Sequence, residues 1–169
     1  MRTEPPAEAP PRVGIPADFA SECLYDRDHW YIHDLLSLDR ETHEVVALID
    51  TTRLGPLVDA QQPWPGHVKH VPGAIAVQVT GTLGNLHAVY AMGLRPSAGW
   101  VGYGTHLESA RFRRIATIGP PVIARAIAHK RRQLRGAWFL GYRFTFAQEG
   151  EVVYESEQTA VWSRRGEGG

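Results

Sequence analysis

The segment from Val71 to Leu94 constrains the fold most, because its 24 residues carry no formal charge in a chain of 169 residues of which 21% are charged. A membrane-spanning helix needs about 20 predominantly apolar residues. Pro72, four glycines and polar residues such as Asn85 and His87 interrupt this segment, so we do not expect it to span a membrane. We expect it instead to lie inside a folded domain.

The spacing of apolar residues predicts a helix over residues 74–94. Four of them fall at i, i+4, i+7 and i+11, which lie on one helical face: Val79, Leu83, Leu86 and Tyr90. Gly81 and Gly84 lie on the far side, where they would let another element approach closely. Each interior glycine costs about 1 kcal/mol relative to alanine, so their presence indicates tight packing. We expect a helix enclosed on nearly all sides.

Patterns typical of strands surround this helix. They predict two strands before it, at residues 31–38 and 45–51, and four after it, at residues 100–113, 122–132, 138–146 and 152–162. The proline-rich connection over residues 53–72 is predicted to be long and irregular, and loops of that length are usually functional or mobile. One helix packed against one curved antiparallel sheet is an α+β arrangement.

The length of the chain fits one domain. Residues 1–16 hold five of the twelve prolines and are interpreted as a disordered tail, residues 17–164 as the domain, and residues 165–169 as a frayed end.

Composition excludes several classes of function. The 18 basic and 18 acidic residues balance, which argues against a nucleic-acid partner. The single cysteine, Cys23, excludes an intramolecular disulfide and a zinc site of several thiolates. The N-terminus lacks the pattern of a secretory signal, so we expect a cytoplasmic protein. The histidine pairs at residues 29 and 33 and at residues 67 and 70 lack an obvious third ligand, so neither a metal site nor a cofactor is expected.

The strongest candidate for chemistry is His70, in the sequence His-Val-Lys-His-Val-Pro-Gly that precedes the predicted helix. Pro72 fixes the chain direction and Gly73 permits a sharp turn, so the imidazole can be aimed at a cleft. A histidine side chain is suited to proton transfer near neutral pH. The helix start offers amide groups that can stabilise an oxyanion. The alternative is a loop histidine without a role.

Three motifs, in this order and spacing, resemble the hotdog-fold 3-hydroxyacyl carrier-protein dehydratases: residues 70–73 (His-Val-Pro-Gly), 81–84 (Gly-Thr-Leu-Gly) and 110–114 (Ala-Arg-Phe-Arg-Arg). The resemblance covers about residues 28–163. It implies a single hotdog fold, with a central helix wrapped by a curved antiparallel sheet, and a homodimer whose sheets join edge to edge.

The resemblance also implies a site between protomers for an acyl thioester on acyl carrier protein or coenzyme A. By that resemblance, His70 removes the α-proton of a 3-hydroxyacyl thioester, while Pro72 and Gly73 help to bind its carbonyl.

The sequence departs from this family on the helix. The dehydratases place an Asp or Glu there, and this helix has no carboxylate. Asn85 is favoured as the positioning group, with Gln78 and Thr82 on the same stripe as substrate-binding residues. His87 projects about 160° around the helix from Asn85, so we interpret it as a packed, hydrogen-bonded histidine.

Three functions therefore stay open. The leading one is reversible dehydration of a 3-hydroxyacyl thioester, with His70 as base and Asn85 as positioning group. The second is thioester hydrolysis or a related addition to an enoyl thioester, since some thioesterases of this fold pair an Asn with a nearby Tyr, as Asn85 and Tyr90 do here. The third is a non-catalytic module that binds an acyl chain or a carrier protein.

Positive charge is concentrated in one part of the chain. Between Ser109 and Gln148 there are nine Lys or Arg residues and no Asp or Glu, and Arg111, Arg113 and Arg114 begin this run. It is interpreted either as a dock for an acidic carrier protein or coenzyme A phosphates, or as a solvated strand face.

Overall fold

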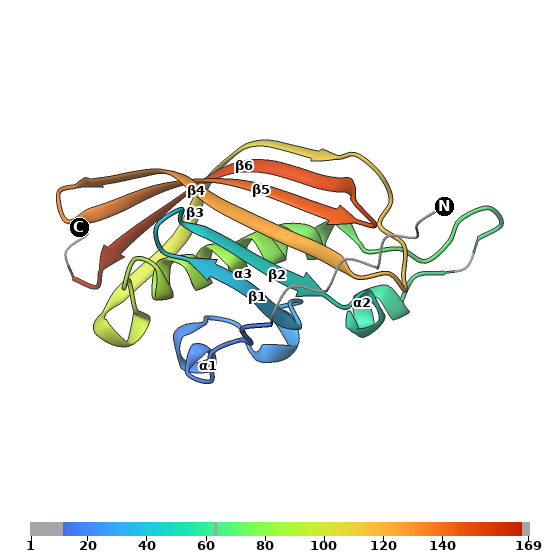
Figure 1. Cartoon of the computed structure of the whole chain (residues 1–169), viewed down its shortest axis with the longest axis horizontal. Helices are drawn as coiled ribbons and strands as arrows, with labels where there is room; N and C mark the ends of the chain where they lie inside the picture. Colours follow the sequence, from blue (N-terminus) through green and yellow to red (C-terminus); the bar gives the residue numbers. More distant parts are fainter. Residues whose placement is uncertain (1–11, 63, 167–169) are drawn as a thin grey trace, which may run out of the picture.

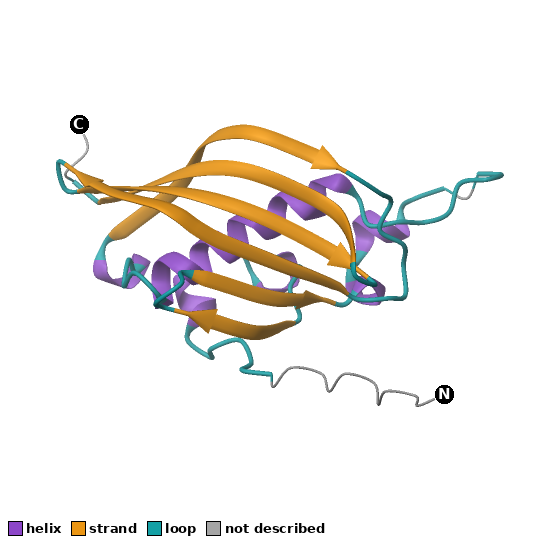
Figure 2. Ribbon diagram, turned by 45° about the horizontal axis from the view of Figure 1, so that its top comes forward, coloured by secondary structure: helices purple, strands orange, loops and turns teal. Residues whose placement is uncertain are grey.

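A curved six-stranded antiparallel sheet wraps one long helix in the computed structural model, which describes residues 12–62 and 64–166 (Figures 1 and 2). The spatial order of the strands is β1-β2-β4-β5-β6-β3. Their bounds are β1 Asp34–Asp39, β2 Glu44–Ile49, β3 Trp100–Phe112, β4 Val122–Leu134, β5 Ala137–Gln148 and β6 Glu151–Arg164. The predicted number and order of the strands and the α+β class are confirmed.

The long helix is α3, Gly73–Tyr90, and it lies along the concave face of the sheet (Figure 2). Its apolar face is buried through Val79, Leu83 and Leu86. The helix ends earlier than predicted, because Gly93 adopts a φ of 71° and the Leu94 amide donates to the Ala88 carbonyl. Such a left-handed glycine after the last turn is a common way to end a helix.

One face of α3 is less enclosed than predicted. Ala74, Val77 and Gly81 are exposed, and a Cβ added at Gly81 would meet no atom within 4 Å. At Gly84 the added Cβ would make only ordinary contacts with the Tyr142 ring, at 3.9 Å. The expectation that these glycines admit a neighbouring element is therefore wrong within one protomer, since no element of the described chain approaches Gly81 closely.

Two-residue turns set the register of the long strands. Arg135 and Gly136 join β4 to β5, and Glu149 and Gly150 join β5 to β6, all four with positive φ. Positive φ at both central residues makes a turn whose twist matches that of the flanking strands. The hairpin turn predicted at residues 149–151 is confirmed.

The connection before α3 is less irregular than predicted. It contains a 3₁₀ turn, η2 (Thr51–Arg53), and a short helix, α2 (Pro56–Asp59). The rest of it projects from one end of the sheet, opposite the β4–β5 hairpin (Figure 1). A further 3₁₀ turn, η3 (Pro96–Ala98), leads into β3.

The segment before β1 packs onto the domain through α1 (Phe19–Glu22) and η1 (Arg27–His29). Phe19 is fully buried and contacts the ring of Trp30. Most of the expected tail lies outside the described residues. Its described part is hydrogen-bonded rather than loose, because the amides of Val13 and Gly14 both donate to the carbonyl of Leu35. In the expected C-terminal end, the amide of residue 165 donates to the Gly99 carbonyl, and residues 167–169 lie outside the described part.

Within the described residues, no helix combines the length and the apolar character that crossing a membrane requires.

Candidate functional site

The backbone of His70 is held on two sides. Its amide donates to the side-chain oxygen of Gln61 at 3.1 Å, and the side-chain nitrogen of Gln61 donates to its carbonyl at 2.7 Å. On the other side His70 forms a bridge with Thr117, and the next amide, that of Val71, donates to the Ala116 carbonyl. The loop is thus fixed where it meets the helix, as the Pro-Gly sequence predicts.

The ring of His70 is partly buried and oriented by a backbone carbonyl. Its Nδ1 lies 3.2 Å from the oxygen of Val68. A carbonyl only accepts hydrogen bonds, so a neutral imidazole in this contact carries its proton on Nδ1 and leaves Nε2 as an acceptor. The ring of His67 packs edge-on against it, with 5.0 Å between the centroids. An unprotonated Nε2 is the form that a general base requires.

A mostly apolar cavity of about 280 Å³ lies beside His70. The start of α3 lines it through Gly73 and Ala76, and the sheet lines it through Phe112, Phe146 and Tyr154. The first amides of a helix have no carbonyl partner within the helix, so they can donate hydrogen bonds to an oxyanion at this end of the cavity. Pro72 is the last residue before α3, in extended conformation with a ψ of 141°.

Asn85 lines a different cavity. This larger space, of about 930 Å³, lies between α3 and the strands β3 and β6, and Gln78 and Thr82 line it as well. About 18 Å of helix separates Gly73 from Asn85, since each residue rises 1.5 Å. The structure therefore does not bring His70 and Asn85 together within one protomer.

The polar stripe of α3 is directed at the segment before β1. The Asn85 side chain donates to the carbonyl of Glu22 at 3.0 Å. The Thr82 hydroxyl donates to the carbonyl of Trp30 at 3.1 Å. The side-chain nitrogen of Gln78 lies 3.5 Å from the carbonyl oxygen of His29. These contacts give all three residues a structural role that the sequence reasoning did not foresee.

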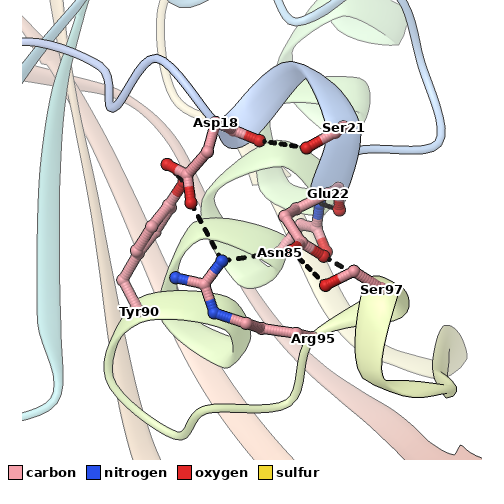
Figure 3. A network of polar contacts seen from close by, with 7 residues as sticks. All are labelled: Asp18, Ser21, Glu22, Asn85, Tyr90, Arg95 and Ser97. Carbon is pink, nitrogen blue, oxygen red and sulfur yellow. Dashed lines mark hydrogen bonds and ion pairs between the residues drawn. The ribbon is translucent and has the colours of Figure 1, made fainter.

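A network of charged residues holds the same segment (Figure 3). Glu22 is only 3% exposed and accepts from the Ser97 amide at 3.1 Å, from the Ser97 hydroxyl and from Arg95. Arg95 also bonds Asp18, which accepts from the Tyr90 hydroxyl at 2.8 Å. Burial raises the pKa of Glu22, but the donors of Ser97 and Arg95 outweigh it and leave that pKa below its ordinary value.

His87 is packed and hydrogen-bonded, as predicted. It is fully buried, with Nδ1 2.9 Å from the Tyr142 hydroxyl and Nε2 3.0 Å from Nδ1 of His43. Burial, together with the charges of His43 and Arg131, lowers the pKa of His87 to about 3. Burial also raises the pKa of Tyr142. The neutral His87 ring therefore links the helix to the sheet.

The arginines at the end of β3 face carboxylates of β6. Arg111 and Arg113 lie 3.6 Å and 2.5 Å from Glu155, and Arg114 lies 3.2 Å from Glu151. Glu151 and Glu155 follow the acid-free stretch in the sequence, but the sheet places them opposite its first arginines. Their negative charges therefore offset the positive charge of these arginines. Arg114 also lines the cavity of His70, whereas Arg111 and Arg113 do not.

One residue of the cavity escaped the sequence reasoning. Tyr154 is 1% exposed, and its hydroxyl has no hydrogen-bond partner among the described residues. Alternation along β6 places Tyr154 on the inner face together with Ser156, so this signal could have found it, whereas Val153 is buried against the alternation. The register explains this, since Phe146 pairs with Tyr154 and Ala147 pairs with Val152, which leaves Val153 as the extra residue of a β-bulge.

In the part of the chain that the structure describes, no three His, Cys, Asp or Glu side chains gather as metal ligands would. The ring of His33, one member of the first histidine pair, bonds the backbone of Asp50 and Arg53.

Comparison with known proteins defines the fold. No family model matches the sequence, and no curated protein matches it. Thioesterase HI1161 from Haemophilus influenzae matches the structure with a TM-score of 0.58 and 18% identity, covering 86% of this chain and 88% of that one. AziG from S. sahachiroi matches with a TM-score of 0.59 and 16% identity, covering 81% and 94%. The dehydratase heterocomplex ApeI:P from Xenorhabdus doucetiae matches with a TM-score of 0.57 and 12% identity, covering 85% and 89%.

The chain thus belongs to the class of α+β proteins in which an antiparallel sheet wraps a single helix. More narrowly, it has the hotdog fold, as the motif resemblance implied. At these identities the likeness establishes the fold, and the activity has to be argued from the site.

Proposed function

We propose that this protein acts on acyl thioesters and catalyses the reversible dehydration of a 3-hydroxyacyl thioester. The observation that carries the proposal is the position of His70. His70, whose ring has Nε2 as an acceptor, is one of the residues that line an apolar cavity beside the first turn of α3. A base, an acyl-sized cavity and free helix amides are what proton abstraction next to a thioester carbonyl requires.

In the proposed reaction, Nε2 of His70 takes the proton from C2 of the acyl chain. The amides at Gly73 and Ala74 stabilise the negative charge that builds on the thioester oxygen. The C2–C3 double bond forms as the C3–O bond breaks, and the departing hydroxyl takes the proton from the His70 imidazolium. The products are a 2-enoyl thioester and water, and His70 returns to its neutral form.

This route needs no carboxylate on α3. Asn85 was expected to act as the positioning group, but its side-chain nitrogen donates to the Glu22 carbonyl beside the other cavity. We therefore propose that His70 performs both proton transfers within one protomer. The cavity of about 280 Å³ lies just below the usual range for ligand sites, roughly 300–1,000 Å³. It fits a short acyl chain.

We further propose a homodimer formed through β3. This strand is an edge of the sheet, and Val101, Tyr103 and Leu107 on it are at least 39% exposed. Long edge strands that expose apolar residues favour pairing with another strand. On the adjoining face of α3, Val77 and Gly81 are exposed, and the absence of a side chain at Gly81 leaves room for a second helix.

For the carrier, we propose acyl carrier protein or coenzyme A. The ion pairs of Arg111, Arg113 and Arg114 with β6 reduce the positive charge beside the cavity. Lys130, Arg132 and Arg135, near the tip of the β4–β5 hairpin, are exposed and have no ion-pair partner among the described residues. That hairpin lies at the end of the sheet away from the His70 cavity, so Arg114, which is exposed and lines the cavity, is the basic side chain of this run that a carrier or a phosphate at the cavity would meet.

Hydrolysis of the thioester is the second candidate. A structural neighbour, HI1161, is a thioesterase. In this alternative Asn85 acts with Tyr90, but the Asn85 side-chain nitrogen already donates to the Glu22 carbonyl and the Tyr90 hydroxyl to Asp18.

The test follows both reactions at once. The protein is incubated with 3-hydroxyacyl, 2-enoyl and saturated acyl thioesters, while enoyl absorbance and free thiol are recorded. We expect the first two to interconvert, and His70→Ala to abolish this. His129→Ala, an exposed histidine on β4, is the matched control. Thiol release instead would establish hydrolysis, and inactivity in both assays would leave a binding module.

A further inference from the structure

The hydroxyl of Tyr154 is buried and lacks a partner. The residue lines the cavity of His70, is 1% exposed, and has no hydrogen bond from its hydroxyl to any described residue. A buried hydroxyl that gives up its bonds to water without replacing them destabilises the protein. Phenylalanine would fill nearly the same space without that cost, so the hydroxyl calls for an explanation.

The neighbours of Tyr154 fix its ring in place. Phe112 on β3 and Phe146 on β5 pair with it across the sheet, and each ring centroid lies 5.1 Å from that of Tyr154. Tyr154 faces the inside of the sheet in phase with Ser156, and a bulge at Val153 directly precedes it. Bulges occur often beside functional sites, where they redirect a side chain.

Few polar groups line this cavity. Besides Tyr154 they are His70 and Arg114, and the other lining residues are apolar or glycine. His70 is partly exposed and Arg114 is exposed, whereas Tyr154 is buried. Tyr154 is thus the one buried polar residue among those that line this cavity in the described part of the chain.

We propose that the Tyr154 hydroxyl donates a hydrogen bond to the 3-hydroxyl oxygen of the bound acyl chain, so that the cavity selects 3-hydroxyacyl over unsubstituted acyl ligands. This inference rests on the proposed function of the same site. The thioester carbonyl accepts hydrogen bonds from the helix amides beside Gly73, at the more exposed end of the cavity. Tyr154 keeps its proton and acts by positioning, because His70 performs both proton transfers.

Sites built to bond a ligand hydroxyl discriminate strongly against analogues that lack it, since their own polar group is then left unpaired. The experiment therefore compares two stable ligands, in which nitrogen replaces the thioester sulfur: 3-hydroxyhexanoyl-pantetheine amide and hexanoyl-pantetheine amide. Their dissociation constants are measured by titration calorimetry with the wild-type protein and with Tyr154→Phe.

We expect the wild type to prefer the hydroxylated ligand by about tenfold or more. In Tyr154→Phe the preference should fall to about twofold or less, through weaker binding of the hydroxylated ligand alone. Tyr90→Phe, which loses a hydroxyl bonded to Asp18 at the other end of α3, is the matched control and should keep the wild-type preference.

Thermal unfolding checks that the effect is not structural. Tyr154→Phe should be at least as stable as the wild type, because the hydroxyl that it loses has no partner in the free protein. Tyr142→Phe, which loses a hydroxyl bonded to His87, should be less stable.

An unchanged preference in a folded Tyr154→Phe would overturn the inference. Because the experiment measures binding, it tests the role of Tyr154 separately from the proposed dehydration. If the wild type binds both ligands but interconverts no thioesters, the reaction is wrong, and a preference lost in Tyr154→Phe still supports the role of Tyr154. If the wild type binds neither ligand, both proposals fall.

Discussion

The ring of Phe112 occupies the space that a side chain at Gly73 would need. A Cβ built on Gly73 would lie 2.9 Å from Cζ of Phe112, closer than side chains pack. Both residues line the cavity of His70, so the absence of a side chain at the start of α3 and the position of this ring depend on each other.

Replacing Gly73 with alanine tests this dependence. We expect Gly73→Ala to push the ring of Phe112 aside, and because this ring is 58% exposed and can move, the cost in stability should be at the low end for overpacking, about 1 kcal/mol. Because the same shift disturbs the cavity mouth, kcat/KM should fall on the order of tenfold or more. Urea unfolding and the enoyl absorbance assay measure the two effects. A variant with wild-type stability and activity would show that the ring moves without consequence.

Gly81 differs from Gly73 in that a side chain there has free space within one protomer. In one protomer nothing lies within 4 Å of a Cβ at this position, and alanine is a better helix former by about 1 kcal/mol. If α3 packs against its copy in the proposed dimer, however, a methyl group there disturbs the interface. We expect Gly81→Ala to weaken the dimer in sedimentation experiments. A stronger or unchanged dimer would show that this face of α3 is not at the interface.

The edge strand β3 gives a second test of the dimer. Leu107 is 53% exposed on this strand, and lysine on an edge strand opposes pairing with another strand. We expect Leu107→Lys to yield a folded monomer, observed by sedimentation together with an unchanged circular dichroism spectrum. Persistence of the dimer would place the interface elsewhere. Co-purification with a different hotdog chain instead would indicate a heterocomplex.

The buried His87 predicts how stability depends on pH. Its pKa is lowered to about 3 in the folded protein, against about 6.5 when unfolded. Between these values the unfolded state binds more protons, so stability is full above about pH 6.5 and falls as the pH is lowered. At pH 4.5 we expect this residue to have cost about 3 kcal/mol. Urea unfolding of the wild type and of His87→Gln at pH 7 and pH 4.5 measures this loss of stability. An equal pH dependence in the two proteins would contradict the prediction.

The contacts of Glu22 make Cys23 a probe of the segment before β1. Glu22→Gln removes the charge that Arg95 and Ser97 bond, and we expect a loss of about 1.5–3 kcal/mol. Cys23, the only cysteine and now partly buried, should then react faster with a thiol reagent. Glu41→Gln, on the exposed β1–β2 turn, is the control and should leave the rate of labelling unchanged.

The parts of the fold that sequence could predict are those that local patterns determine. Alternating residues located the strands, the uncharged stretch located α3, and the turn at Glu149 and Gly150 followed from local chemistry. The position of His70 beside the helix start followed from the chain order alone.

The parts that could not be predicted depend on register and on long-range contacts. The bond from Asn85 to Glu22 joins residues 63 apart in sequence. The ion pairs of Arg113 and Arg114 depend on which residues of β6 lie opposite β3. The burial of Val153 beside Tyr154 depends on a one-residue bulge, which alternation does not reveal.

The bonds from Gln78, Thr82 and Asn85 to residues 22–30 have a consequence for shortened forms of this protein. The segment ahead of the sheet supplies the carbonyls that these three helix side chains require, so it works as a strap across the side of α3 that the strands leave uncovered. Trimming the chain to its first strand would remove these carbonyls together with the buried rings of Phe19 and Trp30 and uncover this side of the helix, so a truncated protein that omits the strap should fold poorly.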